Sequence, residues 1–263
     1  MNKEKEIEIK KLEEKWNYLS SDSKTDSYIG YIAYVDILGY HELIKDRGLI
    51  EICKLIEKAR IDVLLKQLKQ SNVEKFKDVL YSGPHPSESK SSEDGFYKIK
   101  AIAFSDNILL STPSNWSLLL RVVIGMQAAL IQEGIFIRGA MVHGEIYHSD
   151  TLVGGDGLIR AYHIESKVAV YPRIIVDQSY IKAARTASQH LVGNNERIMY
   201  YLKPDFDNNY FLDYLKMDNQ TFKDTHKRKV DEAIEKNKFR FKVLEKFIWC
   251  KTYHEESMCQ DNS

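Results

Sequence analysis

The chain has 263 residues, of which 43% are hydrophobic and 29% are charged, a composition typical of a soluble globular protein. Its 38 Lys and Arg residues balance 38 Asp and Glu residues, so the formal net charge is zero. Overall charge therefore does not draw the protein to nucleic acid or to an anionic membrane, although a local basic pocket for one phosphorylated ligand stays compatible with it. Three widely separated cysteines and a charged N-terminus predict reduced thiols, no signal peptide and a cytoplasmic location.

Hydrophobic periodicity and turn residues predict the secondary structure. In the first half these elements are a helix and polar linker in 1–26, a strand at 28–35, a helix over 41–70 broken near Gly48, an exposed loop at 71–94, a hairpin of strands at 97–104 and 107–112, and a helix at 116–132. In the second half they are a strand pair within 135–147, a helix after Gly154-Gly-Asp-Gly157, a strand at 171–176, a small hairpin within 200–214 and one charged helix over about 222–253.

The order strand, helix, hairpin, helix, strand, helix, strand predicts an α+β fold. We expect a ferredoxin-like antiparallel sheet with covering helices and with helical extensions at both ends. The predicted divisions are an N-terminal helix and linker in residues 1–26, a main domain in 27–192, and a C-terminal hairpin and helix extension in 193–263.

Two aspartates lie at the ends of apolar strands, Asp36 after the first strand and Asp106 in the hairpin turn. A carboxylate among apolar residues is unfavourable to bury unless it is paired or bound to a metal. Two such carboxylates on neighbouring strands could share a pair of Mg²⁺ or Mn²⁺ ions, which clamp the attacking and leaving oxygens of a phosphoryl transfer. The alternative is that each aspartate caps a turn, and the presence of both with their flanking residues favours the metal site.

Four motifs occur in one order between residues 31 and 176. They are Val35-Asp-Ile-Leu-Gly-Tyr40, Phe104-Ser-Asp106, Ile137-Arg-Gly-Ala-Met-Val-His-Gly144 and Gly155-Asp-Gly-Leu-Ile-Arg-Ala-Tyr-His-Ile-Glu165. Each motif is weak alone, and together they resemble the class III nucleotidyl cyclase family. The resemblance implies that residues 27–192 are a cyclase-like catalytic domain. It also implies that two Mn²⁺ or Mg²⁺ ions are held by Asp36, Asp106 and the carbonyl of Ile37.

The chain departs from the purine cyclases of that family at four positions. Ile102 and Leu152 stand where those enzymes have polar residues that read the base, and Ile159 and His163 stand where they have the Asn and Arg that act on the transition state. Hydrogen bonds to a base discriminate strongly between substrates, so their loss argues against a purine nucleotide.

The pyrimidine cyclases of the bacterial antiphage system called Pycsar resemble this chain more closely. The likeness lies in the Asp-x-Leu-Gly-aromatic opening, the Phe-Ser-Asp hairpin and the strand Tyr171-Pro-Arg-Ile174. It implies conversion of UTP, with CTP as the second choice, to 3′,5′-cyclic UMP and pyrophosphate in antiphage defence. It further implies a homodimer with sites at the interface, a separate effector that senses the product, and neither nucleic acid nor membrane as a partner.

The charge that develops on the phosphate oxygens requires a cation, and a bidentate guanidinium suits that geometry. Arg160, at the start of a helix whose N-terminus attracts anions, is the first candidate, and Arg138 is the second. Each arginine has an ordinary surface ion pair as its alternative. Tyr40 and Tyr162 are candidates to donate hydrogen bonds to a pyrimidine base.

Two other functions compete with the cyclase prediction. One is a catalytically silent cyclase-like module that binds a nucleotide and regulates a partner. The other is a metal-dependent enzyme that cleaves or polymerises phosphodiesters, which the neutral charge and the lack of a basic groove in the sequence disfavour.

Overall fold

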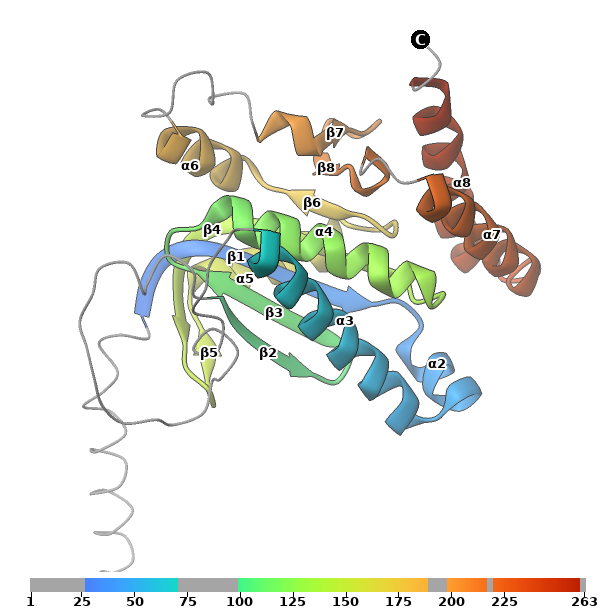
Figure 1. Cartoon of the computed structure of the whole chain (residues 1–263), viewed down its shortest axis with the longest axis horizontal. Coiled ribbons are helices and arrows are strands. Elements are labelled where there is room, and N and C mark those ends of the chain that lie inside the picture. Colours follow the sequence, from blue (N-terminus) through green and yellow to red (C-terminus); the bar gives the residue numbers. More distant parts are fainter. Residues whose placement is uncertain (1–26, 71–98, 189–197, 217–219, 261–263) are drawn as a thin grey trace, which may run out of the picture.

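The structure is a computed structural model that describes residues 27–70, 99–188, 198–216 and 220–260. The predicted N-terminal helix and linker and the predicted loop at 71–94 lie outside these ranges. The elements are β1 (Ser27–Ile37), α2 (Tyr40–Arg47), α3 (Leu49–Gln70), β2 (Lys100–Phe104), β3 (Asn107–Thr112), α4 (Trp116–Gln132), β4 (Ile137–His148), β5 (Val153–Gly154), α5 (Asp156–Lys167), β6 (Ile174–Val176), α6 (Gln178–Ser188), β7 (Leu202–Pro204), β8 (Tyr210–Leu212), α7 (Gln220–Lys236) and α8 (Phe241–Gln260) (Figure 1).

The strands form one sheet in the order β2-β3-β1-β4-β6-β8-β7, with β5 paired to the end of β4. The first four strands pair antiparallel in the order expected of a ferredoxin-like fold, and this confirms the predicted α+β class. β6 then joins β4 in parallel, and the β7–β8 hairpin continues the sheet beyond β6. None of the helices that the described residues form is long and apolar enough to cross a membrane.

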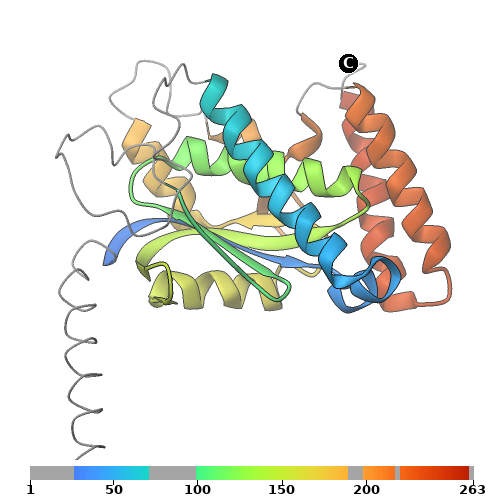
Figure 2. The ribbon, with the colours of Figure 1, turned by 60° about the horizontal axis from the view of Figure 1, so that its bottom comes forward.

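The two faces of the sheet differ in how they are covered. Alternate residues of β1 point to opposite faces, and Tyr31, Ala33 and Val35 join the large core beneath α3, α4 and α6. Ile32 and Tyr34 point to the other face, where α5 is the one helix of the described residues that packs against β4 and β1 (Figure 2). Asp36 follows the same alternation and therefore lies on the face of α5.

Glycines let α5 approach the sheet closely. A Cβ on Gly144 of β4 would lie 3.1 Å from the Cα of Gly157 in the first turn of α5, so side chains at these positions would push the helix away. Gly139 allows β4 to pair closely with β1, because a Cβ there would lie 2.4 Å from the carbonyl oxygen of Tyr34. We expected these glycines to mark turns of a strand pair, and that prediction is wrong, since β4 is one continuous strand.

One further prediction of secondary structure is wrong, and one helix was not predicted. The charged C-terminal helix is two helices, because α7 ends at Lys236 and α8 starts at Phe241, and the two pack side by side (Figure 2). No Pro or Gly marks this break, where Asn237 donates its side-chain amide to the carbonyl of Ala233 at 2.8 Å. Helix α6 was not predicted. In α3 the buried side is formed by Ile52, Ile56 and Ala59, whereas Ile50 is exposed.

Candidate active site

Asp36 lies in a polar row that crosses three neighbouring strands. It is paired with Asn107 of β3 on one side and with Arg138 of β4 on the other. The Nε of Arg138 donates to Oδ2 of Asp36 at 3.0 Å, and its Nη2 forms an ion pair with Oε1 of Glu165 at 2.8 Å. Glu165 comes from the last turn of α5 and is almost fully buried. Strand pairing and helix packing thus place one guanidinium between two carboxylates.

The β2–β3 turn brings Asp106 to the same place. Ser105 has φ 54°, the positive value that a tight two-residue hairpin turn requires at its first central residue. The carbonyl of Asp106 accepts from the N–H of Ile37 at 2.8 Å, which fixes the turn against the end of β1. The Asn107 side chain donates to Oδ1 of Asp106 at 2.9 Å. The structure therefore places Asp36, Ile37 and Asp106 next to one another, and their role as metal ligands stays a prediction.

Burial and mutual repulsion raise the pKa of two of these carboxylates. Burial is the largest cause for Asp36, where the hydrogen bond and charge of Arg138 act in the opposite direction and the charge of Asp106 adds to the rise. Burial likewise raises the pKa of Glu165, together with the charges of Asp36 and Asp106 and against the attraction of Arg138. A cation in this place would relieve the repulsion among the three carboxylates.

Lys246 of α8 is the second cation of the site. Its charge interacts with Asp36, Glu165 and Arg138, and burial is the largest cause of a lowered pKa for its ammonium. Tyr34, two residues before Asp36 on the same face, lies within the field of Glu165 and Asp36. Burial first and these charges next raise the pKa of the Tyr34 hydroxyl to about 12.

The donor set fits Mg²⁺ or Mn²⁺, although nothing among the described residues forms a group of three or more His, Cys, Asp or Glu side chains able to hold a metal. Asp36 and Asp106 offer hard carboxylate oxygens, and Mg²⁺ is commonly held by one or two carboxylates that substrate phosphates and water complete. Oε1 of Glu165 is buried and has no well-aligned hydrogen bond, although Nη2 of Arg138 lies 2.8 Å from it.

The other predicted cation, Arg160, lies elsewhere on α5. It is half exposed, and its Nη2 lies 2.8 Å from Oδ1 of Asp177, just before α6. Asp177 in turn accepts the backbone N–H of Ser179 at 2.9 Å. Within one chain the structure thus joins Arg138 to the carboxylate cluster, and it joins Arg160 to Asp177 instead.

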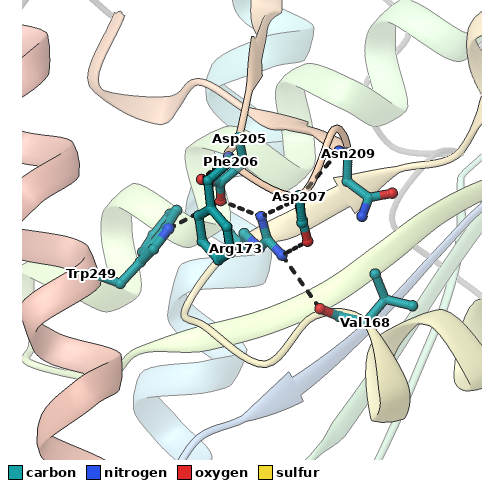
Figure 3. A network of polar contacts seen from close by, with 7 residues as sticks. All are labelled: Val168, Arg173, Asp205, Phe206, Asp207, Asn209 and Trp249. Atoms are coloured by element: carbon teal, nitrogen blue, oxygen red, sulfur yellow. Dashed lines mark hydrogen bonds and ion pairs between the residues drawn. The ribbon is translucent and has the colours of Figure 1, made fainter.

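Arg173, in the motif Tyr171-Pro-Arg-Ile174, belongs to a separate buried cluster (Figure 3). It is 1% exposed, and its two terminal nitrogens bind Asp205 and Asp207 of the β7–β8 turn. Its guanidinium carbon lies 5.9 Å from the ring centroid of Trp249, whose Nε1 donates to Asp205 at 3.0 Å. Arg173 therefore ties the β7–β8 turn and α8 to the core.

The structure does not bring the four candidate base-binding residues together: Ile102 packs against the apolar cluster of the α5 face, whereas Tyr40 packs against the large core on the other side of the sheet. Ile102 of β2 lines a pocket of about 170 Å³ with the end of β4, and Leu152 is exposed in the following turn, where its N–H bonds Oγ of Ser149 at 3.0 Å. Tyr162 is exposed on α5 and meets the ring of Tyr34 edge to face at 6.0 Å. Tyr40 is half-buried at the start of α2; burial first and then the Cys53 thiol raise the pKa of its hydroxyl.

Sequence reasoning assigned no role to Tyr34, Glu165 or Lys246. The period-2 alternation of β1 puts Tyr34 on the same face as Asp36, so that signal was present. Glu165 follows the buried Ala161 by one helical turn, which also marks it as facing the sheet. Nothing in the charged sequence of α8 distinguishes Lys246 from its neighbouring lysines.

No protein-family model matches the sequence, and no curated protein matches it. One similar solved structure is a bacterial light-regulated adenylyl cyclase, with 14% identity and a TM-score of 0.37 over 60% of this chain and 45% of that one. Another is a class III adenylyl cyclase-like ATP-binding protein from Pseudomonas aeruginosa, with 13% identity and a TM-score of 0.40 over 72% of this chain and 39% of that one. The chain spans less than half the length of either protein, and likeness at this level assigns it neither a family nor an activity.

Proposed function

We propose that the protein is a nucleotidyl cyclase that converts UTP, or CTP as the second choice, to the 3′,5′-cyclic monophosphate and pyrophosphate. The observation that carries the proposal is the joining of Asp36, Asp106 and Arg138 at one end of a half-covered sheet face. The four sequence motifs shared with class III cyclases supply these three residues in the order that the family would require.

The reaction joins the ribose 3′-oxygen to the α-phosphorus and breaks the bond to the β-phosphate oxygen, while the hydroxyl proton leaves. Asp36, Asp106 and the carbonyl of Ile37 would hold two Mn²⁺ or Mg²⁺ ions, which lower the pKa of the hydroxyl and balance phosphate charge when bound. Arg138 is already fixed by Asp36 and Glu165, so its remaining N–H groups would bind a phosphoryl oxygen with little loss of side-chain entropy.

A homodimer with sites at the interface would bring Arg160 of one subunit to the metal ligands of the other. The face of α5 supports this proposal, because α5 covers β4 and β1 while β2 is largely open on that side. Exposed apolar side chains border the open region: Phe104 is 45%, Tyr162 is 55% and Ile159 is 65% exposed. Such a group of exposed apolar residues is typical of a protein–protein contact, and a two-fold partner would cover both copies.

A pyrimidine base is supported by what the candidate base pocket lacks. The side chain of Ile102 packs beside the apolar cluster of the α5 face and offers no hydrogen bond, and the same holds for the aliphatic Leu152. A purine whose polar edge faced Ile102 and Leu152 would find no hydrogen bond from these two side chains, at roughly 1–3 kcal/mol for each unpaired nitrogen; the polar residues of the pocket are Lys100, His148, Ser149 and Asp150. A single ring fits a pocket of about 170 Å³ more readily than a double ring. Tyr162 and Tyr40 stay candidate donors to the base.

The same residues support a second function, that of a silent nucleotide-binding module. Arg138 binds the metal ligand Asp36 directly, and Arg160 is paired with Asp177. Ile159 and His163 replace the transition-state residues of the family. Such a module would bind a triphosphate and form no product.

The cellular setting is proposed from the likeness to Pycsar cyclases. The protein would act in the cytoplasm of a bacterium during phage infection, and its cyclic nucleotide would act on a separate effector that senses it. Neither nucleic acid nor a membrane takes part in this proposal.

The test is incubation of the purified protein with all four nucleoside triphosphates at equal concentration with Mn²⁺, followed by mass analysis. Predominant cyclic UMP supports the full proposal, and predominant cyclic CMP overturns only the choice of uracil. Cyclic AMP or cyclic GMP as the main product overturns the pyrimidine claim. Triphosphate binding without product identifies the silent module, and cleavage of a labelled oligonucleotide identifies a phosphodiester-cleaving enzyme.

A further inference from the structure

The C-terminal helix α8 is joined to the loop that follows Asp36. Phe247 of α8 meets the ring of Phe136 with centroids 5.0 Å apart and the planes at 73°. The carbonyl of Phe136 accepts from the N–H of Leu38 at 2.9 Å. Both phenylalanines are buried, so α8 is held at a fixed place beside this loop. Lys246, the residue before Phe247, is positioned by the same contact.

A cavity of about 390 Å³ separates α8 and α7 from the loop and α2. Leu38 and Gly39 form part of one wall, and Lys246 forms part of the other. The cavity begins two residues after Asp36, so it adjoins the candidate active site. In Figure 2 the paired helices α7 and α8 stand beside α2 at the end of the sheet.

Lys246 differs from the other cations that line this cavity. Lys229 binds Glu232 at 3.1 Å, Lys236 binds Asp46 at 2.5 Å, and Arg240 binds Glu42 at 2.5 Å.

Lys246 is half-buried, and within the described part of the chain it makes no hydrogen bond or ion pair of that kind. Its ammonium interacts electrostatically with Asp36 and Glu165 without contacting either carboxylate directly. A cation held partly out of water without a direct partner is unfavourable unless a ligand supplies the opposite charge.

We infer that Lys246 is a substrate-binding residue whose ammonium contacts the β- and γ-phosphates of the nucleoside triphosphate, and therefore the pyrophosphate that leaves. This inference rests on the proposed function, since it names the part of the substrate that extends from the metal ligands into the cavity. A triphosphate adds several negative charges beside three carboxylates, and Arg138 and the metal ions would balance part of that charge. The ammonium of a lysine is a compact charge that follows a mobile phosphate well. The C-terminal extension thereby forms part of the active site.

The test measures binding of inorganic pyrophosphate by calorimetry, with and without Mn²⁺, so that one readout is independent of turnover. Lys246→Met keeps the length of the side chain and removes its charge, and we expect it to weaken pyrophosphate binding at least about tenfold. Lys246→Arg keeps the positive charge, and its affinity for pyrophosphate should lie within about threefold of the wild-type value. Lys236→Met is the matched control, because Lys236 lines the same cavity and is paired with Asp46; it should change binding by less than about twofold.

Turnover separates this inference from the proposed function. If the wild-type enzyme makes a cyclic nucleotide, Lys246→Met should raise the KM for the triphosphate far more than it lowers kcat. If the wild type is a cyclase and a folded Lys246→Met variant binds pyrophosphate as well as the wild type does, the inference is wrong and the proposed function stands. A wild-type protein that makes no product overturns the proposed function, and the dependence of pyrophosphate binding on Lys246 still decides whether phosphates bind there. Absence of pyrophosphate binding by the wild type overturns the inference.

Discussion

Two arginines of this protein each lie between two carboxylates, and their surroundings differ. Arg173 is 1% exposed and is surrounded by aromatic rings, and it binds two aspartates of the β7–β8 turn (Figure 3). Arg138 is 22% exposed on the open sheet face and binds Asp36 and Glu165. An arginine between two carboxylates therefore occurs once with a fully buried guanidinium and once with a partly exposed guanidinium on the sheet face of α5.

The two clusters differ in how well the protein itself neutralises the carboxylates. Burial raises the pKa of Asp207, yet hydrogen bonds from Arg173 and Asn209 outweigh burial and leave that pKa lowered. At Asp36 and Glu165 burial and repulsion outweigh Arg138, and both pKa values are raised. In the Arg173 cluster the protein's own hydrogen bonds thus favour the ionised form of Asp207, although Nε of Arg173 has no hydrogen-bond partner, whereas in the Arg138 cluster the ionised carboxylates are disfavoured and a bound cation would stabilise them.

The largest effect is expected when a metal-ligand carboxylate beside Arg138 is removed. Asp36→Ala or Asp106→Ala should lower cyclase turnover by about 10³-fold or more, since a metal ion supplies several kcal/mol of transition-state stabilisation. Both variants should stay folded, because each removes a charge from a repulsive group. Asp46→Asn is the control, with an exposed aspartate that pairs with Lys236. Near-normal activity of either alanine variant at saturating Mn²⁺ contradicts the assignment.

Mixing two inactive variants tests whether residues of two subunits form one active site around the Arg138 cluster. Asp36→Ala and Arg160→Ala chains, each inactive alone, should regain about a quarter of wild-type activity, since half of the dimers are mixed and one of their two sites is intact. The control mixes Asp36→Ala with Asp106→Ala chains. Both residues serve the same site from one subunit, so no activity should return. A fully active monomer in sedimentation and kinetics excludes the homodimer.

Stability measurements should show the opposite ranking of the two arginines. Arg173→Met leaves two carboxylates in a buried place without a cation and should lower the free energy of unfolding by about 3–5 kcal/mol. Arg138→Met should lower it by at least about 2 kcal/mol less, because the raised pKa of Asp36 and of Glu165 lets one of them take up a proton in place of the lost cation, while the change removes most of the turnover. Chemical denaturation monitored by tryptophan fluorescence gives both values. Equal destabilisation by the two variants would remove the distinction between the clusters.

The fold was predictable where its signals are local. The apolar alternation of β1, the Ser105-Asp106 turn and the Asn115 cap of α4, which accepts the N–H of Leu118 at 3.0 Å, each specify structure within a few residues. The addition of β7 and β8 to the sheet was not predictable, because it depends on a single pairing of β8 with β6 and on the burial of Arg173. These contacts join residues far apart in sequence.

The same distinction between local signals and contacts between distant residues applies to the candidate site. Asp36 and Asp106 were found because a charge at the end of an apolar strand is visible locally. The partners of Arg138 were not, since Glu165 reaches it only after α5 packs on the sheet through Gly144 and Gly157. The domain boundaries at residues 26 and 192 stay predictions.

The smallest effect concerns the packing that continues from the Arg173 cluster into the C-terminal helices. Nδ1 of His226 in α7 lies 3.2 Å from Nδ1 of His254 in α8, and Nε2 of His226 lies 3.1 Å from the hydroxyl of Tyr214. Burial first and the charge of His254 next lower the pKa of His226 from 6.5 to about 3, and burial also lowers the pKa of His254. The folded protein therefore holds both rings neutral at a pH where an unfolded chain protonates them.

The sign of the pH dependence follows from that difference. Because the unfolded chain binds protons that the folded chain does not, stability should be full above pH 7 and fall as the pH drops below 6.5 toward 3. One such histidine contributes a slope of about 1.4 kcal/mol per pH unit. His226→Gln keeps a hydrogen-bonding partner for Tyr214 and removes the titration, so its free energy of unfolding should vary less steeply between pH 7.5 and 5.5 than that of the wild type. The slope, measured by urea denaturation at each pH, is the decisive quantity, because the variant can lose stability at every pH through altered packing. An unchanged slope in His226→Gln would mean that α7 and α8 separate enough in the folded state to let water protonate the pair, and the C-terminal packing would then resemble the open Arg138 site more than the closed Arg173 cluster.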